Sequence, residues 1–424
     1  MRPRVTPRLG YHQAKRDEVI RPGEHAPDAL LRSRDVSLSE ATLNTIQPRR
    51  LPAQRALAGT LAVLALALAF AWTSPPAHAQ NGAVADAARL VRDGNLYFSQ
   101  GDCALAQYFF QEALKRDEDN PEALVGKGRA LACQNAFAAA IEAFRQTIDV
   151  HPSHVPAYVH LALTYQEQFL FDPAGHGGRL ADALDVLQRA ERVAGDDASV
   201  QNTKGIVLYQ AGDLVAAQRA LERAVELASA GTLSERERST IQVNLGRTYR
   251  DLEQLELAQQ AFRRAVVLDP NNASARNNLG NVMYRLGDCS GAEYELSQAV
   301  ALAPNSLSAV SQLAIALFEC GDVEGSIPRF ERALQLDGAV FTPPLFTYLA
   351  RAYLQQGRLD DAVRRAQQGA LLPPESAEAH YYLGRAYEAR GTTGDLENAR
   401  RAFERALELE PGFSAARTAL DALR

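Results

Sequence analysis

The 424-residue sequence has few of the residues and motifs on which catalysis and cofactor binding depend. It contains one tryptophan (Trp72), two methionines and four cysteines. It has no Gly-Lys-Ser/Thr phosphate-binding loop, no Gly-x-Ser-x-Gly elbow and no His-Glu-x-x-His motif. The sequence therefore offers no catalytic residue, no metal-ligand set and no cofactor site, and we expect a protein that is not an enzyme.

Positive charge is also scarce over most of the chain. The whole sequence has a net charge of −6, but residues 1–79 hold eleven Lys or Arg and six Asp or Glu, which leaves residues 80–424 at about −11. Proteins that bind nucleic acid usually present a basic face. We therefore expect no nucleic-acid partner, and we interpret the acidic residues as a solvated outer surface.

The first 79 residues differ in composition from the remainder. Residues 1–55 are rich in Arg and Pro and have no sustained apolar period, which indicates a disordered leader. Residues 56–79 contain an unbroken apolar run followed by prolines and small residues that end at Ala79. A basic, then apolar, then small-x-small order is typical of a secretory signal peptide. We predict cleavage between Ala79 and Gln80, export to the periplasm or the cell exterior, and a short linker over residues 80–86.

Two alternatives stay open for this segment. The apolar run 56–72 could remain uncleaved and anchor the protein in a membrane, with the Arg-rich leader held inside. The run is shorter than the roughly 20 residues that a spanning helix needs, which favours cleavage. A signal peptide about fifty residues from Met1 is unusual, so we also hypothesise a translation start further downstream, for example at Val36 or Leu51.

A sequence pattern recurs about every 34 residues over residues 87–412. The copy from Ala273 illustrates it, because Leu279, Gly280 and Met283 share one helical face and Gly287-Asp288 then interrupts the helix. Small and bulky residues of a second helix follow, and a proline closes the copy. Nine copies begin near Ala87, Pro121, Val155, Ala198, Ser239, Ala273, Leu307, Pro343 and Ala377.

This pattern resembles the tetratricopeptide repeat, in which each unit is a helix-turn-helix and the units stack into a right-handed superhelix. The resemblance implies an all-α solenoid of about nine units over residues 87–412, with residues 413–424 as a C-terminal cap helix. It also implies a non-catalytic scaffold that holds a protein or peptide in a concave groove. The first helix of each unit would line that groove.

The resemblance assigns polar and aromatic residues of the first helices to the groove. Amide side chains both donate and accept hydrogen bonds, which suits an extended peptide, and Arg suits carboxylates. The positions are Asn244, Arg247, Asn277, Asn278, Asn281, Arg285, Gln312, Tyr348, Arg351 and Arg385. Two alternatives remain: these side chains solvate the groove without a ligand, or they bind a cell-wall polysaccharide strand.

The four cysteines form two pairs at equivalent places in the repeat. Cys103 and Cys289 follow the Gly-Asp turn of a unit, and Cys133 and Cys320 end the first helix of the next unit. Stacking would make the members of each pair neighbours, and an exported protein meets oxidising conditions. We predict the disulfides Cys103–Cys133 and Cys289–Cys320. The alternative is that the four cysteines are small core residues. The sequence has no Cys-x-x-Cys motif and no His at ligand spacing from a Cys, so redox chemistry and a zinc site are not supported.

Two places interrupt the regular pattern. Residues 169–178 form an insertion between the helices of the third unit, and we expect Phe169 and Phe171 to pack on the neighbouring unit. Before the fifth unit, the spacing of Thr232 and Glu235 predicts a capping box that opens a longer helix.

Overall fold

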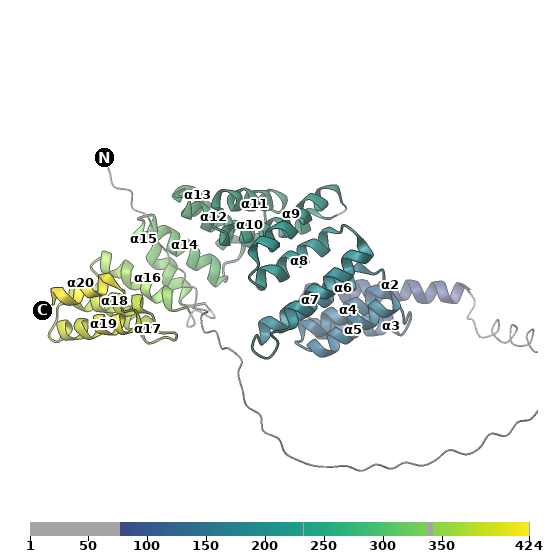
Figure 1. Ribbon diagram of the computed structural model, residues 1–424, viewed down its shortest axis with the longest axis horizontal. Helices are drawn as coiled ribbons and strands as arrows, with labels where there is room; N and C mark the ends of the chain where they lie inside the picture. Colours follow the sequence, from purple (N-terminus) through teal and green to yellow (C-terminus); the bar gives the residue numbers. More distant parts are fainter. Residues whose placement is uncertain (1–76, 232, 337–341, 424) are drawn as a thin grey trace, which may run out of the picture. The chain divides into compact units, whose positions relative to one another are not determined.

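The computed structural model describes residues 77–231, 233–336 and 342–423, and the structural statements below concern these residues. They form 19 α-helices and no strand, which confirms the predicted all-α class (Figure 1). No helix among them combines the length and the apolar character that crossing a membrane requires. The predicted leader 1–55 and the apolar run 56–72 lie outside the described residues.

The helices follow one another in pairs, one pair for each repeat unit. The first helices are α2 (Ala77–Ser99), α4 (Pro121–Cys133), α6 (Val155–Phe171), α8 (Ala198–Gln210), α10 (Glu235–Asp251), α12 (Ala273–Arg285), α14 (Leu307–Glu319), α16 (Pro343–Gln355) and α18 (Ala377–Arg390). The second helices are α3 (Cys103–Leu114), α5 (Phe137–Val150), α7 (Arg179–Ala194), α9 (Leu214–Ala230), α11 (Leu255–Leu268), α13 (Cys289–Leu302), α15 (Val323–Ala333), α17 (Leu359–Ala370) and α19 (Asp395–Leu409). The last helix is α20 (Ser414–Ala422).

Small residues let the two helices of a unit approach closely. In the unit of α12 and α13, Leu296 and Ala299 are fully buried. A Cβ atom added at Gly280 would lie 2.6 Å from Cγ of Leu296, so a larger residue could not stand there without displacing the second helix. The second helix then packs against the first helix of the next unit, and the buried residues of the array form five core clusters, most of which span more than one unit.

The recurrent Gly-Asp pair forms the turn between the two helices. Gly287 has a φ of 85°, a left-handed conformation that glycine adopts without steric cost. Asp288 is the N-cap of α13, and its side chain accepts a hydrogen bond from the backbone N–H of Gly291. The two residues thus end one helix and start the next.

Most predicted helix starts coincide with the structure, and two differ. Helix α2 begins at Ala77 and includes residues 80–86, so the predicted linker is wrong; the alanine-rich sequence there contains no proline to stop the helix. Helix α10 begins at Glu235, and its capping box pairs Ser234 with Glu237 rather than the predicted residues two positions earlier. A Ser hydroxyl three residues before a Glu satisfies the same rule at this later place.

The insertion in the third unit extends α6 through Phe171. The Phe171 ring lies edge-on to Phe137 of the preceding unit, with 5.7 Å between the centroids, yet it remains 70% exposed. Phe169 packs against the core around α6 and α7. The predicted contact with the neighbouring unit is therefore made by Phe171, although most of its side chain is exposed, and Phe169 packs against the core.

Candidate peptide-binding face

The first helices of neighbouring units contact one another as well as their own partners. Side chains from α8, α10, α12, α14, α16 and α18 consequently meet along one surface, which we call the first-helix face. All ten predicted groove residues lie on these helices. The structure therefore places them where side chains of successive units can act together on one extended ligand.

Hydrogen bonds between polar side chains connect successive first helices. Asn244 Nδ2 donates to Asn202 Oδ1 (3.0 Å), Arg250 Nη1 donates to Asn278 Oδ1 (3.0 Å), and Asn281 Nδ2 donates to Gln312 Oε1 (2.7 Å). These bonds link α8 to α10, α10 to α12 and α12 to α14. The result is a ladder of paired side chains that fixes the orientation of each amide on the first-helix face.

Pairing uses only part of what each amide offers. A carboxamide carries two donors and an acceptor with two lone pairs. In the Asn281–Gln312 pair, the bond occupies one donor of Asn281 and one lone pair of Gln312. The carbonyl oxygen of Asn281 and the amino group of Gln312 are left for a ligand, and one accepts while the other donates. This combination matches the N–H and C=O of an extended peptide backbone.

Asn277 contributes an acceptor that has no partner among the described residues. Its Nδ2 donates to Ser308 Oγ on α14 (3.3 Å), while its Oδ1 is buried and unpaired. A buried polar atom without a hydrogen bond costs about 1–3 kcal/mol. A ligand donor that reached this oxygen would remove that cost.

Arg247 and Tyr209 form a second polar group, between α8 and α10. The Arg247 guanidinium lies 5.3 Å from the centroid of the Tyr209 ring, and the Tyr209 hydroxyl donates to Asp251. Burial and the Asp251 contact raise the pKa of Tyr209. Burial opposes ionisation of Asp251, but hydrogen bonds from Arg250 and Tyr209 lower its pKa overall, so this carboxylate stays charged. A small cleft of about 30 Å³ lies beside Tyr209, Asn244 and Arg247.

Arg285 and Arg385 present charge at the surface. Arg285 pairs with the exposed Glu253 at 2.5 Å, and Arg385 pairs with Glu388 at 3.0 Å on its own helix. Ion pairs of exposed side chains contribute about 0–1 kcal/mol. A ligand carboxylate could therefore replace Glu253 or Glu388 at small cost.

Arg351 occupies the centre of an aromatic cluster on α14, α16 and α18. Its guanidinium carbon lies 4.9 Å from the ring centroids of Phe318 and Tyr348 and 5.1 Å from that of Tyr382. It pairs with Glu319 at 3.2 Å, and burial raises the pKa of Tyr348 to about 12. Cation–π contacts and the ion pair hold Arg351 in one orientation, with its charge largely matched inside the protein.

Most predicted groove residues thus lie on the first-helix face, but they make different kinds of contact. Asn244, Asn278, Asn281 and Gln312 form the ladder, whereas Arg351 is engaged by aromatic rings. Sequence reasoning missed the acidic partners, Glu253 and Glu319, which follow or end a first helix. Each Glu precedes its Arg by 32 residues, close to the repeat length of about 34, and this spacing was the available signal.

The two cysteine pairs meet as predicted. Cys103 is bonded to Cys133, and Cys289 to Cys320, with Cα atoms 6.2 Å and 5.9 Å apart, within the range of ordinary disulfides. Each bond joins the start of a second helix to the end of the next first helix. The disulfides therefore fasten the first unit to the second and the sixth to the seventh.

Comparisons with known proteins support the repeat assignment. Models of the tetratricopeptide repeat match residues 91–155, 174–232 and 348–412, and a related TPR-repeat model matches 246–287, which together exceed half of the chain. A chain in the crystal structure of the hetero-tetramer Cut9–Hcn1 of APC/C is similar in fold, with a TM-score of 0.52 and 16% identity over 78% of this chain and 64% of that one.

Similarity to curated proteins is limited to part of their length. The chain is 30% identical over 123 residues to the CTR9 homolog of Arabidopsis thaliana, which is 29% of this chain and 10% of that protein. It is 24% identical over 174 residues to the probable N-acetylglucosaminyltransferase SPINDLY of Hordeum vulgare, which is 41% of this chain and 18% of that protein. The chain thus spans less than a fifth of either relative.

The matches agree with the helix pairs, the Gly-Asp turns and the buried small residues described above. Arrays of this kind present extended binding surfaces, so the fold suggests a protein–protein interaction scaffold. The chain belongs to the tetratricopeptide-repeat proteins.

Proposed function

We propose that this protein is an exported, non-catalytic scaffold of the cell envelope, and that it binds an extended peptide segment of a partner protein on the first-helix face. The observation that carries the proposal is the ladder of amide side chains from α8 to α14. The Asn281–Gln312 rung leaves one acceptor and one donor without a partner among the described residues, and an extended backbone offers the complementary groups at regular intervals.

Charge favours a peptide with acidic side chains near the ladder. Arg285 and Arg247 flank the amides, and their present partners are an exposed Glu and an aromatic ring. A carboxylate on the ligand would form a charge-assisted hydrogen bond with either guanidinium. A neutral glycan would leave both arginines as they are, which makes the polysaccharide alternative weaker.

Replacing Asn244, Asn278 and Asn281 together with Ala tests the peptide site. Wild-type protein and the triple variant would each be cross-linked to partners in the native envelope and captured, and purified glycan strands would be offered in parallel. We expect the variant to lose the proteins that wild type retains. Gln260→Ala combined with Ser297→Ala, at exposed positions of α11 and α13, is the matched control and should retain them. Equal capture by the triple variant would reject the first-helix face.

Export has its own measurement, the intact mass of protein recovered from its native envelope with and without reduction. We expect a chain that starts at Gln80 and gains about four protons on reduction, because two disulfides open. A mass that includes the apolar run 56–72 would instead support the membrane-anchored alternative.

A further inference from the structure

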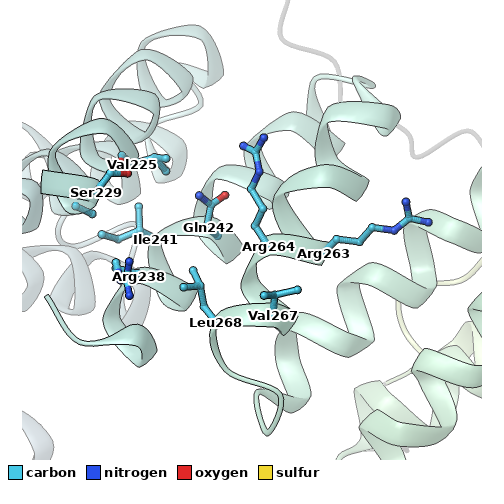
Figure 2. A pocket seen from close by; sticks show the side chains of 10 residues that line it. Val225, Ser229, Arg238, Ile241, Gln242, Arg263, Arg264, Val267 and Leu268 are labelled. Atoms are coloured by element: carbon cyan, nitrogen blue, oxygen red, sulfur yellow. Dashed lines mark hydrogen bonds between the residues drawn. The ribbon is translucent and has the colours of Figure 1, made fainter.

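A second candidate site lies away from the first-helix face, where the fourth and fifth units meet. A cavity of about 400 Å³ opens between α9, α10 and α11, and Figure 2 shows Arg238, Ile241 and Gln242 between the side chains of α9 and those of α11. Protein pockets that bind small molecules typically have a volume of about 300–1,000 Å³. This cavity is therefore large enough for one bulky apolar side chain and its neighbours.

The cavity lies at a junction that departs from the repeat. At the next junction, α11 ends at Leu268 and α12 begins at Ala273. At the fourth–fifth junction, α9 continues through Ala230 and α10 begins already at Glu235, so each helix carries an additional turn. A small separate core of Ala224, Ala228 and Ile241 lies at this junction, and the cavity opens beside it.

The lining is apolar at the base and positively charged at the rim. Val225, Ala228, Ile241, Val267 and Leu268 supply the apolar surface, and Val267 is 79% exposed. None of the ten lining residues is acidic, although the chain as a whole has a net charge of −6. An exposed apolar surface beside uncompensated charge is typical of an interaction site.

Three arginines supply this charge. Arg263 and Arg264 make no ion pair and no hydrogen bond with any other side chain that the structure describes. Arg238 has one distant acid, Glu235 at 3.8 Å, and its Nε is buried without a partner. The described residues therefore supply a counter-ion for Arg238 alone, and the charges of Arg263 and Arg264 are unpaired there.

Gln242 adds an unmet acceptor in the lining. Its side chain is only 7% exposed, and its Oε1 is buried with no hydrogen bond within the described residues. A fatty acid or another simple carboxylate has no donor for this oxygen, whereas a peptide backbone N–H has one. The lining is therefore complementary to a ligand that carries three groups: an apolar side chain, a carboxylate and an amide donor.

We propose that the cavity between α9, α10 and α11 binds a partner protein through a short segment in which an apolar residue is flanked by Asp or Glu. The apolar side chain fills the cavity, a backbone N–H donates to Gln242, and the carboxylates pair with Arg238 and Arg264. This site is independent of the ladder on the first-helix face, so the array has two separate places for partners.

Methyl-group NMR of the full chain tests the proposal with a defined probe. The probe is the acetylated and amidated peptide Gly-Ser-Glu-Leu-Glu-Ser-Gly. We expect it to shift the methyl signals of Val225, Ile241 and Leu268 and to leave those of Val282 and Leu313 in place. A counterpart with Lys for both Glu, and one with Ala for Leu, should shift none of them.

Matched variants locate the contact. Arg264→Glu and Val267→Asp should each weaken binding of the probe about ten-fold, because they reverse a rim charge and place a carboxylate on the apolar surface. Arg219→Glu and Val215→Asp change exposed residues of α9 outside the lining and should leave the affinity unchanged. Thermal melting of all four variants checks that they fold.

Three outcomes would overturn the proposal. They are no methyl shift with the acidic peptide, an equal response to the basic peptide, and shifts with sodium decanoate where the peptide gives none. The Asn244, Asn278 and Asn281 triple variant should bind the probe like wild type, so failure of one site leaves the other testable.

Discussion

The regular junction between α12 and α14 and the cavity at the fourth–fifth junction differ in how far their polar side chains are paired. Between α12 and α14, Asn281 donates to Gln312 and Asn277 donates to Ser308, although Asn277 Oδ1 is unpaired, and a disulfide closes the same junction. Between α9, α10 and α11, Gln242 keeps an unpaired oxygen and Arg264 has no counter-ion among the described residues. The bond from Asn244 to Asn202 also crosses the fourth–fifth junction, so the unpaired groups of this junction are those at the cavity between α9, α10 and α11.

This contrast separates two ways in which one array can offer a surface. On the first-helix face, side chains are ordered by each other and a ligand meets prepared groups, so little conformational entropy remains to be lost. At the cavity, the ligand itself must supply the missing partners. Binding there would therefore respond more strongly to ligand charge, and binding at the ladder more strongly to backbone geometry.

Opening a regular junction should give the largest effect. We expect Cys289→Ser with Cys320→Ser to lower the free energy of unfolding by roughly 3–4 kcal/mol, because the disulfide closes a loop of about 30 residues in the unfolded chain. Urea unfolding of oxidised protein measures it. Reduction of wild type should reproduce the loss and add that of Cys103–Cys133. An unchanged midpoint would mean that the disulfide contributes nothing to stability.

Acid should loosen the junction of the second and third units. Burial, with a smaller contribution from nearby Arg129, lowers the pKa of His160 to about 4, and its ring stacks on Phe144. In the unfolded chain, the pKa of His160 is about 6.5, so between pH 6.5 and pH 4 the unfolded state binds a proton that the folded state does not. The contribution of His160 to stability is therefore fully present above pH 6.5. This stability, on the order of 1–3 kcal/mol, is lost as pH falls from about 6.5 toward 4.

His160→Gln supplies the comparison for this pH dependence. The variant has no titrating ring at the position, so its melting temperature should fall less between pH 6.5 and pH 4 than that of wild type. Carboxylates that titrate in the same range affect both proteins alike and cancel in the difference. Parallel melting curves for the two proteins would show that His160 does not carry the effect.

Replacing a polar side chain with an apolar one should change the free energy of unfolding in opposite directions at the two kinds of junction. Gln242→Met removes a buried, unpaired oxygen at nearly constant volume, and we expect it to stabilise the protein by about 1 kcal/mol. Asn281→Leu breaks the bond to Gln312 and should destabilise by about 1 kcal/mol. Urea midpoints of the two variants measure this. Destabilisation by Gln242→Met would show that its oxygen has a partner, such as water.

Features that repeat could be predicted from the sequence, and features that depend on the irregular junction could not. The Gly287-Asp288 pair predicts a turn, because glycine adopts the positive φ and Asp caps the next helix. The cysteine pairing followed from equivalent positions in two copies. In contrast, the bond from Asn244 to Asn202 spans 42 residues, whereas that from Asn281 to Gln312 spans 31. The additional turns of α9 and α10 account for part of this difference, and no regular spacing anticipates them.

The smallest expected effect comes from Glu253, because it stands where most other units have glycine. Its φ is 60°, and the equivalent Gly287 has 85°. A non-glycine residue in this conformation is strained by about 1 kcal/mol, and glycine would remove that strain. Glycine also increases the conformational entropy of the unfolded chain, which cancels part of the gain in stability. Loss of the exposed ion pair with Arg285 subtracts little. We therefore expect Glu253→Gly to stabilise the protein by roughly 0.5 kcal/mol in urea unfolding. Glu253→Ala removes the same ion pair and keeps the strain, so a glycine variant no more stable than the alanine variant would mean that the turn relaxes at no cost.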